Sequence, residues 1–216
     1  MNNLVHIIDY GTNNIQSVVQ AFHFVGVNTK ITNKPLDLID ADHIVIPGVG
    51  AFSEGMKKLK NLGLDKMIIK KAEQKSNILG ICLGMQMLFT KGHEYGEHDG
   101  LNLVSGEVLE IKKTINHVNR LPIIGWRKTF SSSSQKKNLL AKSLNEKSFY
   151  YLHSYQVIPE KKDDIFAYYE IVDNITINAA ITKDNIWGVQ FHPEKSGPAG
   201  LEFLKNFSNL SKNKKT

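Results

Sequence analysis

The residues best suited to covalent chemistry surround the single cysteine of the chain. Cys82 lies in the middle of the segment 80–84, which follows an apolar run and begins and ends with glycine. Glycine on both sides of a nucleophile is typical of a sharp strand-to-helix turn, because glycine tolerates a strained backbone and close neighbours. The thiol then lies at a helix N-terminus, which favours the thiolate, and the amide of Leu83 is suited to hold an oxyanion. The alternative is an inert, buried cysteine at a tight turn.

A histidine and a glutamate two residues apart end a later β-like run. In an extended chain, residues i and i+2 share a face, so His192 and Glu194 can lie side by side. Glu194 would then accept a hydrogen bond from one imidazole nitrogen and leave the other to act as a base for Cys82. Taken alone, the pair fits a surface histidine beside a solvated glutamate equally well. Together with the cysteine turn, it predicts a Cys–His–Glu triad.

A glycine-rich turn follows an apolar run in the segment 47–52. Its residues Gly48, Val49 and Gly50 would expose backbone N–H groups, which either cradle a phosphate or complete an oxyanion hole. The segment is no phosphate-binding P-loop, because no Gly-Lys-Ser/Thr follows it. The alternative is a turn without a function of its own.

An aromatic-rich segment, 150–155, shows the alternation of a strand. It either forms core and edge structure alone or, through His153 and Ser154, lines a polar pocket. The remaining histidines show no spacing typical of metal ligands, so we expect neither a metal nor another cofactor.

The elements that must position these residues alternate between strands and helices up to Phe89. Strands are expected at 4–8, 27–32, 43–46 and 77–81, and helices at 15–25, 52–74 with a break at 61–63, and 83–89. Such alternation implies parallel βαβ crossovers with helices on both faces of a sheet. Asn14 and its neighbours offer an N-cap to the first helix.

After Gly100, short β-like stretches replace the helices. They occupy 103–111, 123–130, 149–157, 165–170, 175–182 and 186–191, with a Ser/Lys-rich loop at 131–137 and a closing helix at 198–210. The predicted fold is α/β: a three-layer, open, mostly parallel central sheet with an antiparallel, β-rich second half. We expect a single domain at 1–210 and a basic, disordered tail at 211–216.

Composition excludes several classes of protein. The chain has 216 residues, 41% of them hydrophobic, which is ample for a globular core. The chain has a net charge of +6. Part of the positive charge lies in the C-terminal tail and part in scattered lysine pairs, which are typical of a solubilising surface rather than a nucleic-acid interface. One cysteine excludes an internal disulfide and fits a reducing compartment. No signal peptide or membrane-spanning run is present, so we expect a cytoplasmic protein.

Four segments in this order resemble class I (triad) glutamine amidotransferases. They are 47–52, 80–86, 151–155 and 190–196. Within that family, the Gly-Val-Gly-Ala-Phe form of the first segment and the opening Ile-Asp-Tyr-Gly are similar to the glutaminase subunits of imidazole glycerol phosphate synthases, which serve histidine biosynthesis.

The resemblance implies a role for each candidate residue. Cys82 would attack the side-chain amide of glutamine and form a glutamyl thioester, while His192, oriented by Glu194, shuttles the proton to the departing ammonia. The oxyanion would be held by backbone amides of Leu83 and of the turn Gly48, Val49, Gly50. The glutamine would be held by Gln86, His153, Ser154 and Tyr155. Ammonia would pass to a partner subunit, a (β/α)8-barrel cyclase.

Two segments depart from the family pattern. Trp126 is followed by Arg127 where the family usually has Asn, in a segment expected near the docking face for the cyclase, and residues 91–97 replace the usual Ser-x-Glu-Glu-Gly. Because of these departures, a different partner remains an alternative to the cyclase, namely a sugar-amidating enzyme of surface-polysaccharide synthesis. A regulatory pseudoenzyme and a cysteine peptidase on a similar sheet are the alternatives from other classes.

Overall fold

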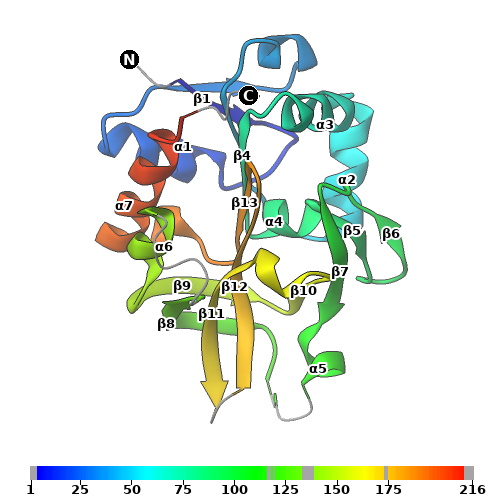
Figure 1. Ribbon diagram of the computed structural model, residues 1–216. Coiled ribbons are helices and arrows are strands. Elements are labelled where there is room, and N and C mark those ends of the chain that lie inside the picture. Colours follow the sequence, from blue (N-terminus) through cyan, green and yellow to red (C-terminus); the bar gives the residue numbers. More distant parts are fainter. Residues whose placement is uncertain (1–3, 116–117, 119, 133–138, 173–174, 212–216) are drawn as a thin grey trace.

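A large mixed sheet runs through the molecule (Figure 1). It is seen in a computed structural model that describes residues 4–115, 118, 120–132, 139–172 and 175–211. The neighbouring strands are, in order, β2 (Thr29–Thr32), β1 (Val5–Ile8), β3 (His43–Ile46), β4 (Asn77–Ile81), β13 (Ile186–Val189), β12 (Ile175–Lys183), β11 (Ile165–Val172), β8 (Ile123–Ser131) and β9 (Lys147–His153).

The first part of this sheet is parallel, from β2 to β13. Strands β1, β3, β4 and β13 are buried along their whole length, as the apolar runs predict for strands covered on both faces. The later strands, from β13 through β12, β11 and β8 to β9, pair antiparallel. The predicted α/β class is confirmed, and the parallel and antiparallel parts share one sheet.

A smaller sheet packs beside the large one. It joins β10 (Tyr155–Pro159), β7 (Val104–Glu110), β5 (Phe89–Gly92) and β6 (His98–Asp99). The single strand predicted at 149–157 is therefore wrong, because the chain changes sheets at Ser154. His153 still pairs with β8, whereas Tyr155 pairs with Glu110 of β7. A contact of 2.7 Å between His153 Nδ1 and the Tyr155 carbonyl closes the turn between them.

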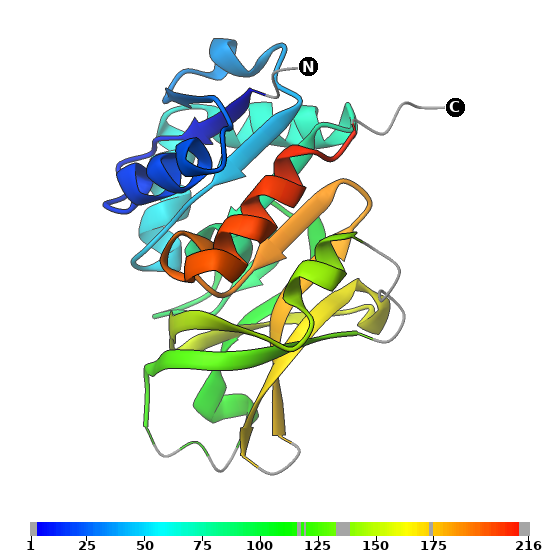
Figure 2. The ribbon, with the colours of Figure 1, turned by 90° about the vertical axis from the view of Figure 1, so that its left-hand side faces the viewer.

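Helices cover both faces of the large sheet (Figure 2). One face carries α1 (Ile15–Phe24), α6 (Leu139–Leu144) and α7 (Gly197–Ser208), and the other carries α2 (Phe52–Asn61), α3 (Leu64–Glu73) and α4 (Leu83–Met87). The sheet has a hydrophobic core on each face, and successive residues of a strand pack into opposite cores. Val45 packs in the core beneath α1 and α7, whereas Ile44 and Ile46 pack in the core beneath α2 and α3. This is the three-layer arrangement that the sequence predicts.

Several elements differ from the expectation. Helix α4 ends at Met87 rather than at residue 89, because Phe89 begins β5. The short strands β5 and β6 and the short helices α5 (Ile111–Thr114) and α6 were not predicted, since each is too brief to show a periodicity. The predicted break between α2 and α3 is confirmed, with Gly63 in the left-handed region at φ +67°. Residues 133–137 of the Ser/Lys-rich loop and 212–216 of the tail lie outside the described residues.

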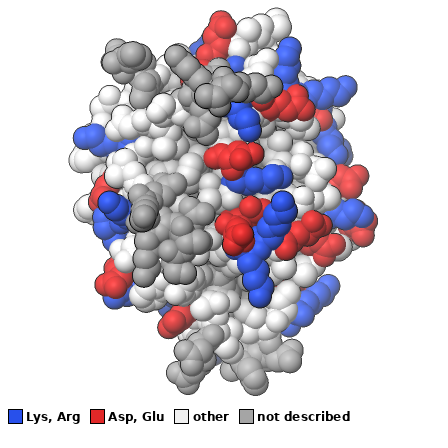
Figure 3. Space-filling model, in the orientation of Figure 1, with Lys and Arg blue, Asp and Glu red and all other residues white. Residues whose placement is uncertain are grey.

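Charged side chains of both signs are interspersed on the face shown in Figure 3. Several surface lysines pair with carboxylates, including Lys30 with Asp37 and Lys91 with Glu97. This arrangement fits the interpretation of the scattered lysines as a solubilising surface. No helix formed by the described residues is both long and apolar enough to cross a membrane.

Candidate active site

Cys82 occupies a strained turn between β4 and α4. Its φ is +54°, a left-handed value that is costly for a residue with a side chain. The flanking glycines permit the turn, since a Cβ on Gly80 would lie 2.5 Å from the Gly84 carbonyl oxygen, and a Cβ on Gly84 would lie 1.8 Å from the Ile46 carbonyl oxygen. The predicted sharp turn is thus present. As the first residue of α4, Leu83 has an amide without an intrahelical acceptor.

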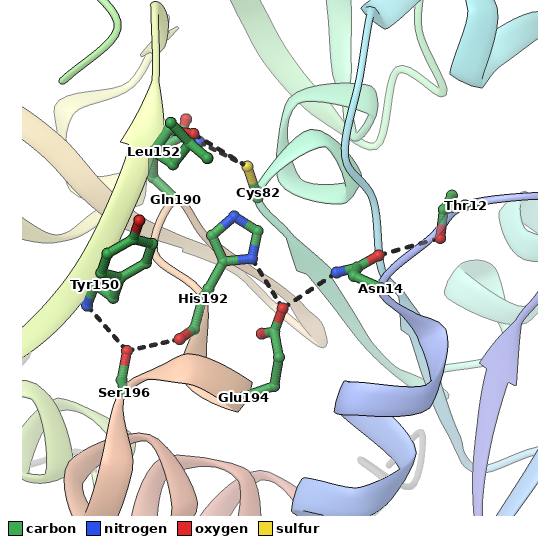
Figure 4. A network of polar contacts seen from close by, with 9 residues as sticks. All are labelled: Thr12, Asn14, Cys82, Tyr150, Leu152, Gln190, His192, Glu194 and Ser196. Carbon is green, nitrogen blue, oxygen red and sulfur yellow. Dashed lines mark hydrogen bonds and ion pairs between the residues drawn. The ribbon is translucent and has the colours of Figure 1, made fainter. Parts of the chain in front are cut away.

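His192 and Glu194 lie side by side just after β13. The distance from His192 Nδ1 to Glu194 Oε1 is 2.8 Å, and the two side chains are 1% and 0% exposed. Because Nδ1–H donates to the carboxylate, the other ring nitrogen is left facing Cys82 (Figure 4). The i, i+2 spacing therefore produces the contact expected from the sequence.

The charges around His192 favour its protonated form. Burial of the ring opposes a positive charge, but the hydrogen bonds and negative charges of Cys82 and Glu194 outweigh it and raise the pKa of His192 to about 10. At neutral pH the imidazolium is consequently the stable form next to the sulfur. It is ready to give a proton to a leaving amine.

Asn14 is a site residue that sequence reasoning missed. It stands at the N-cap position of α1 as predicted, yet its side chain makes no capping hydrogen bond. Instead, Nδ2 donates to Glu194 Oε1 at 3.1 Å, while Oδ1 accepts from the hydroxyl of Thr12 at 3.1 Å (Figure 4). The β1–α1 loop thus holds the same carboxylate oxygen that His192 contacts.

Gln190 is a second residue that was missed. Its side chain is fully buried and its Nε2 lies 3.5 Å from Cys82 Sγ. Its Oε1 accepts a hydrogen bond of 3.2 Å from Nε2 of Gln86, a predicted glutamine-binding residue. A signal was present in the sequence, because Gln190 precedes His192 by the same two residues that separate His192 from Glu194.

A cavity of about 350 Å³ opens in front of the cysteine. Predicted site residues line it: Val49, Gly50, Cys82, Leu83, Gln86, His153, Ser154, Tyr155 and His192. Gly48 lies behind this wall, where a Cβ would come within 2.4 Å of the Tyr10 hydroxyl. Lining residues that were not predicted are Glu94, Tyr95, Glu110, Leu121, Pro122 and Leu152.

The acidic members of this wall come from the smaller sheet and its loops. Glu94 Oε2 accepts a hydrogen bond of 2.7 Å from the amide of Phe52, the first residue of α2, which fixes the carboxylate at the pocket. Glu110 ends β7. The pocket therefore offers negative charge to a positively charged group of a ligand.

His153 lines the pocket, but both of its ring nitrogens already have partners. Nδ1 contacts the Tyr155 carbonyl, and Nε2 lies 2.8 Å from the Tyr169 hydroxyl. Burial lowers the pKa of His153 to about 4, so the ring is neutral at physiological pH. Its contribution is to shape the wall rather than to offer a free hydrogen-bonding nitrogen.

Trp126 and Arg127, the predicted docking residues, lie on opposite faces of the β8–β9 ribbon. Trp126 is 54% exposed and packs edge-on against its cross-strand neighbour Tyr150. Arg127 pairs with the buried Phe149, and its charge acts on the buried Tyr169, so its side chain lies on the inner face. The two side chains point away from each other, because successive strand residues point to opposite sides.

Comparisons with known proteins cover almost the whole chain. The family profile described as "Glutamine amidotransferase class-I" matches residues 6–210. The imidazole glycerol phosphate synthase subunit HisH of Wolinella succinogenes is 37% identical, over 96% of this chain and 100% of that relative. The subunit of the same name from Chlorobium chlorochromatii is also 37% identical, over 96% of this chain and 100% of that relative.

Solved structures agree with the fold. A crystal structure of a glutamine amidotransferase superposes with a TM-score of 0.73 at 15% identity, covering 95% of this chain and 99% of the other. The structure of PurLQS from Thermotoga maritima contains a chain with a TM-score of 0.71 at 17% identity, covering 97% and 99%. With the family profile and the near full-length relatives in agreement, this chain belongs to the class I glutamine amidotransferase family.

Proposed function

We propose that this chain is the glutaminase subunit of an imidazole glycerol phosphate synthase, hydrolysing glutamine to glutamate and ammonia and passing the ammonia to a cyclase subunit. The observation that carries the proposal is near full-length identity of 37% to proteins named as that subunit. Cys82 and His192 line one pocket, Glu194 contacts His192, and this arrangement supplies a mechanism. Residues 1–210 would form a single glutamine amidotransferase domain.

The reaction begins with attack on the side-chain amide of glutamine. The Cys82 sulfur bonds to the amide carbon, and the carbonyl oxygen becomes an oxyanion. The amides of Leu83 and of the turn Gly48, Val49, Gly50 stabilise it, since backbone donors that are already in place cost no reorganisation. His192 gives its proton to the amide nitrogen, the carbon–nitrogen bond breaks, and ammonia leaves a glutamyl thioester.

The second half of the reaction releases glutamate. After it has given up its proton, the neutral imidazole of His192 accepts a proton from water, whose oxygen attacks the thioester carbon. The carbon–sulfur bond breaks, and Cys82 leaves as a thiolate beside the regenerated imidazolium. Glu194 holds the ring in one tautomer throughout, because its Oε1 accepts from Nδ1.

Glutamine complements the charges of the pocket. Its α-ammonium group matches the carboxylates of Glu94 and Glu110 at the wall, whereas its neutral side-chain amide reaches Cys82. Gln86, Ser154 and Tyr155 line the path between these ends. A pocket with carboxylates at one end and Cys82 at the other selects a free amino acid, because a residue within a protein chain has no α-ammonium group. This disfavours the peptidase alternative.

An exposed apolar face next to the pocket supports docking to the cyclase. Ile124 and Trp126 on β8 and Leu152 on β9 are 55%, 54% and 38% exposed, on one side of the ribbon. Leu152 also lines the cavity, so a partner covering this face would close the pocket. Closure matters because ammonia released into water at pH 7 becomes unreactive ammonium. We propose a (β/α)8-barrel cyclase as that partner.

Affinity purification of the tagged chain from its own cells tests the partner. The proposal predicts recovery of a cyclase subunit, and a complex that makes imidazole glycerol phosphate with glutamine as the nitrogen source. Recovery of a sugar-amidating synthase instead, with no cyclase, would contradict the pathway while leaving the glutaminase chemistry in place.

A further inference from the structure

A buried glutamine side chain lies directly beside the sulfur of Cys82. We propose that Gln190 is a catalytic residue that donates a hydrogen bond from Nε2 to the Cys82 sulfur and thereby favours the thiolate, with Gln86 as the positioning residue that orients its amide. The inference rests on the proposed function, because it matters for the reaction only if Cys82 is the nucleophile. Gln190 follows the last residue of β13, and Figure 4 draws its contact with the Cys82 sulfur as a dashed line.

The strand register explains why this contact forms. Strands β4 and β13 run parallel, with Ile81 opposite Val189, so the next residues on each chain, Cys82 and Gln190, emerge side by side. The Cys82 amide donates to the Val189 carbonyl at 2.8 Å, and the Gln190 amide donates to the Ala179 carbonyl at 2.8 Å. Both backbones are therefore fixed, and the distance between the side chains is set by the sheet.

The orientation of the Gln190 amide follows from Gln86. Nε2 of Gln86 donates to Oε1 of Gln190, which leaves the Nε2 end of Gln190 toward the sulfur. Flipping the Gln190 amide would place two NH2 groups against each other and would turn a carbonyl oxygen toward the sulfur. Because Gln190 is fully buried, its amide is shielded from bulk solvent and these contacts fix its orientation.

The donor discriminates between the two forms of the cysteine. A thiol can donate to the Leu152 carbonyl, which lies 4.0 Å from Sγ, whereas a thiolate is an acceptor alone. Gln190 Nε2 is nearer, at 3.5 Å, and a donor to an ionised acceptor is stronger than a donor to a neutral one. Gln190 therefore favours the thiolate over the thiol.

This support is needed because the neighbouring helix contributes little. Helix α4 spans Leu83–Met87, barely more than one turn, so its dipole is small. His192 favours the thiolate through its charge, but it loses that charge when it gives its proton to the departing amide nitrogen of glutamine. Gln190 is neutral and exchanges no proton, so it stabilises the sulfur both at the attack and when the thiolate leaves the thioester.

The experiment is the pH dependence of alkylation of the full-length chain by iodoacetamide, followed by mass spectrometry. Since the chain has one cysteine, the rate reports on Cys82 alone. Gln190→Met removes the donor at similar volume, and Gln190→Glu keeps the shape but turns a carboxylate toward the sulfur. The matched control is Gln156→Met, a buried glutamine whose Nε2 bonds instead to Thr114 at 2.6 Å.

We expect the pH of half-maximal alkylation to rise by about one to two units in Gln190→Met, as for loss of one hydrogen bond to a charged group. The rise should be larger in Gln190→Glu and absent in Gln156→Met. Midpoints equal to wild type in both Gln190 variants would overturn the inference. Gln190→Glu keeps the test decisive if Gln190→Met fails to fold.

Failure of this inference is distinguishable from failure of the proposed function. Unchanged midpoints in a complex that still hydrolyses glutamine through Cys82 would remove the role of Gln190 alone. Glutamine hydrolysis that survives Cys82→Ala would instead remove Cys82 as the nucleophile, whatever the alkylation midpoints.

Discussion

Asn14 Nδ2 donates to Glu194 Oε1 at 3.1 Å, which connects the loop after β1 to the carboxylate behind His192. The other oxygen, Oε2, is buried without a hydrogen bond among the described residues. The orientation of Glu194 therefore depends on the contacts that Oε1 makes with Asn14 and His192.

Asn14→Asp should lower kcat for glutamine by about one to two orders of magnitude with little change in KM. The reason is that a carboxylate cannot donate to Glu194, and a hydrogen bond to a charged group is worth about 1.5–3 kcal/mol. Helix α1 should be unaffected, because Asn14 makes no capping bond and Asp is itself a good N-cap residue. Steady-state kinetics of the complex measures the effect, and a kcat equal to wild type would refute it.

Gly84→Ala should cost more than about 3 kcal/mol of unfolding free energy, since the new methyl group would lie 1.8 Å from the Ile46 carbonyl oxygen. Gly26→Ala is the control: a Cβ added there has no described atom within 4 Å, and φ is +78°. It should lose only the cost of left-handed backbone, about 1–2 kcal/mol. Urea denaturation compares the two variants, and equal losses would show that the close approach at Gly84 is relaxed at no cost.

Trp126→Ala should weaken binding to the cyclase about 30-fold or more, because truncating a tryptophan at the centre of an interface costs about 2 kcal/mol or more. Arg127→Asn should leave the dissociation constant almost unchanged, since the Arg127 side chain lies on the inner face. This revises the sequence-based expectation that both residues contact the partner. Calorimetric titration tests it, and a larger effect at Arg127 than at Trp126 would reverse the assignment.

His153 predicts a pH dependence of stability. Burial lowers the pKa of His153 to about 4, below the 6.5 of an exposed histidine. Between pH 6.5 and 4, the imidazole of His153 therefore binds a proton in the unfolded chain but not in the folded chain. Because of this difference, His153 lowers the free energy of unfolding as the pH drops from 6.5 toward 4. His153→Asn retains a donor for the Tyr155 carbonyl. In urea denaturation, its free energy of unfolding should fall less steeply with decreasing pH than that of the wild type. An identical slope in both proteins would contradict the buried, neutral state.

The parts of the site that the sequence predicted are local in the chain. The turn at Cys82 is encoded by its own glycines, and the contact of His192 with Glu194 follows from i, i+2 spacing. Buried apolar runs likewise placed β3 and β4 at their observed bounds.

The missed parts join distant segments. Asn14 contacts Glu194 across 180 residues, and Gln190 contacts Cys82 across 108. Only the completed sheet brings these residues together. The two-residue spacing of Gln190 and His192 indicates a shared face of one strand, but it does not indicate the contact with Cys82. The change of sheet at Ser154 was missed for a similar reason, because an alternating pattern continues through the bend between β9 and β10.

The role of Cys82 as the nucleophile is best tested with the Cys82→Ala variant in complex with its cyclase, assayed with glutamine and, separately, with an ammonium salt at alkaline pH. We expect glutamine-dependent formation of imidazole glycerol phosphate to be abolished and ammonia-dependent formation to match wild type, because the cyclase needs only ammonia. Loss of both activities would make Cys82 structural, and retention of the glutamine-dependent activity would place the nucleophile elsewhere.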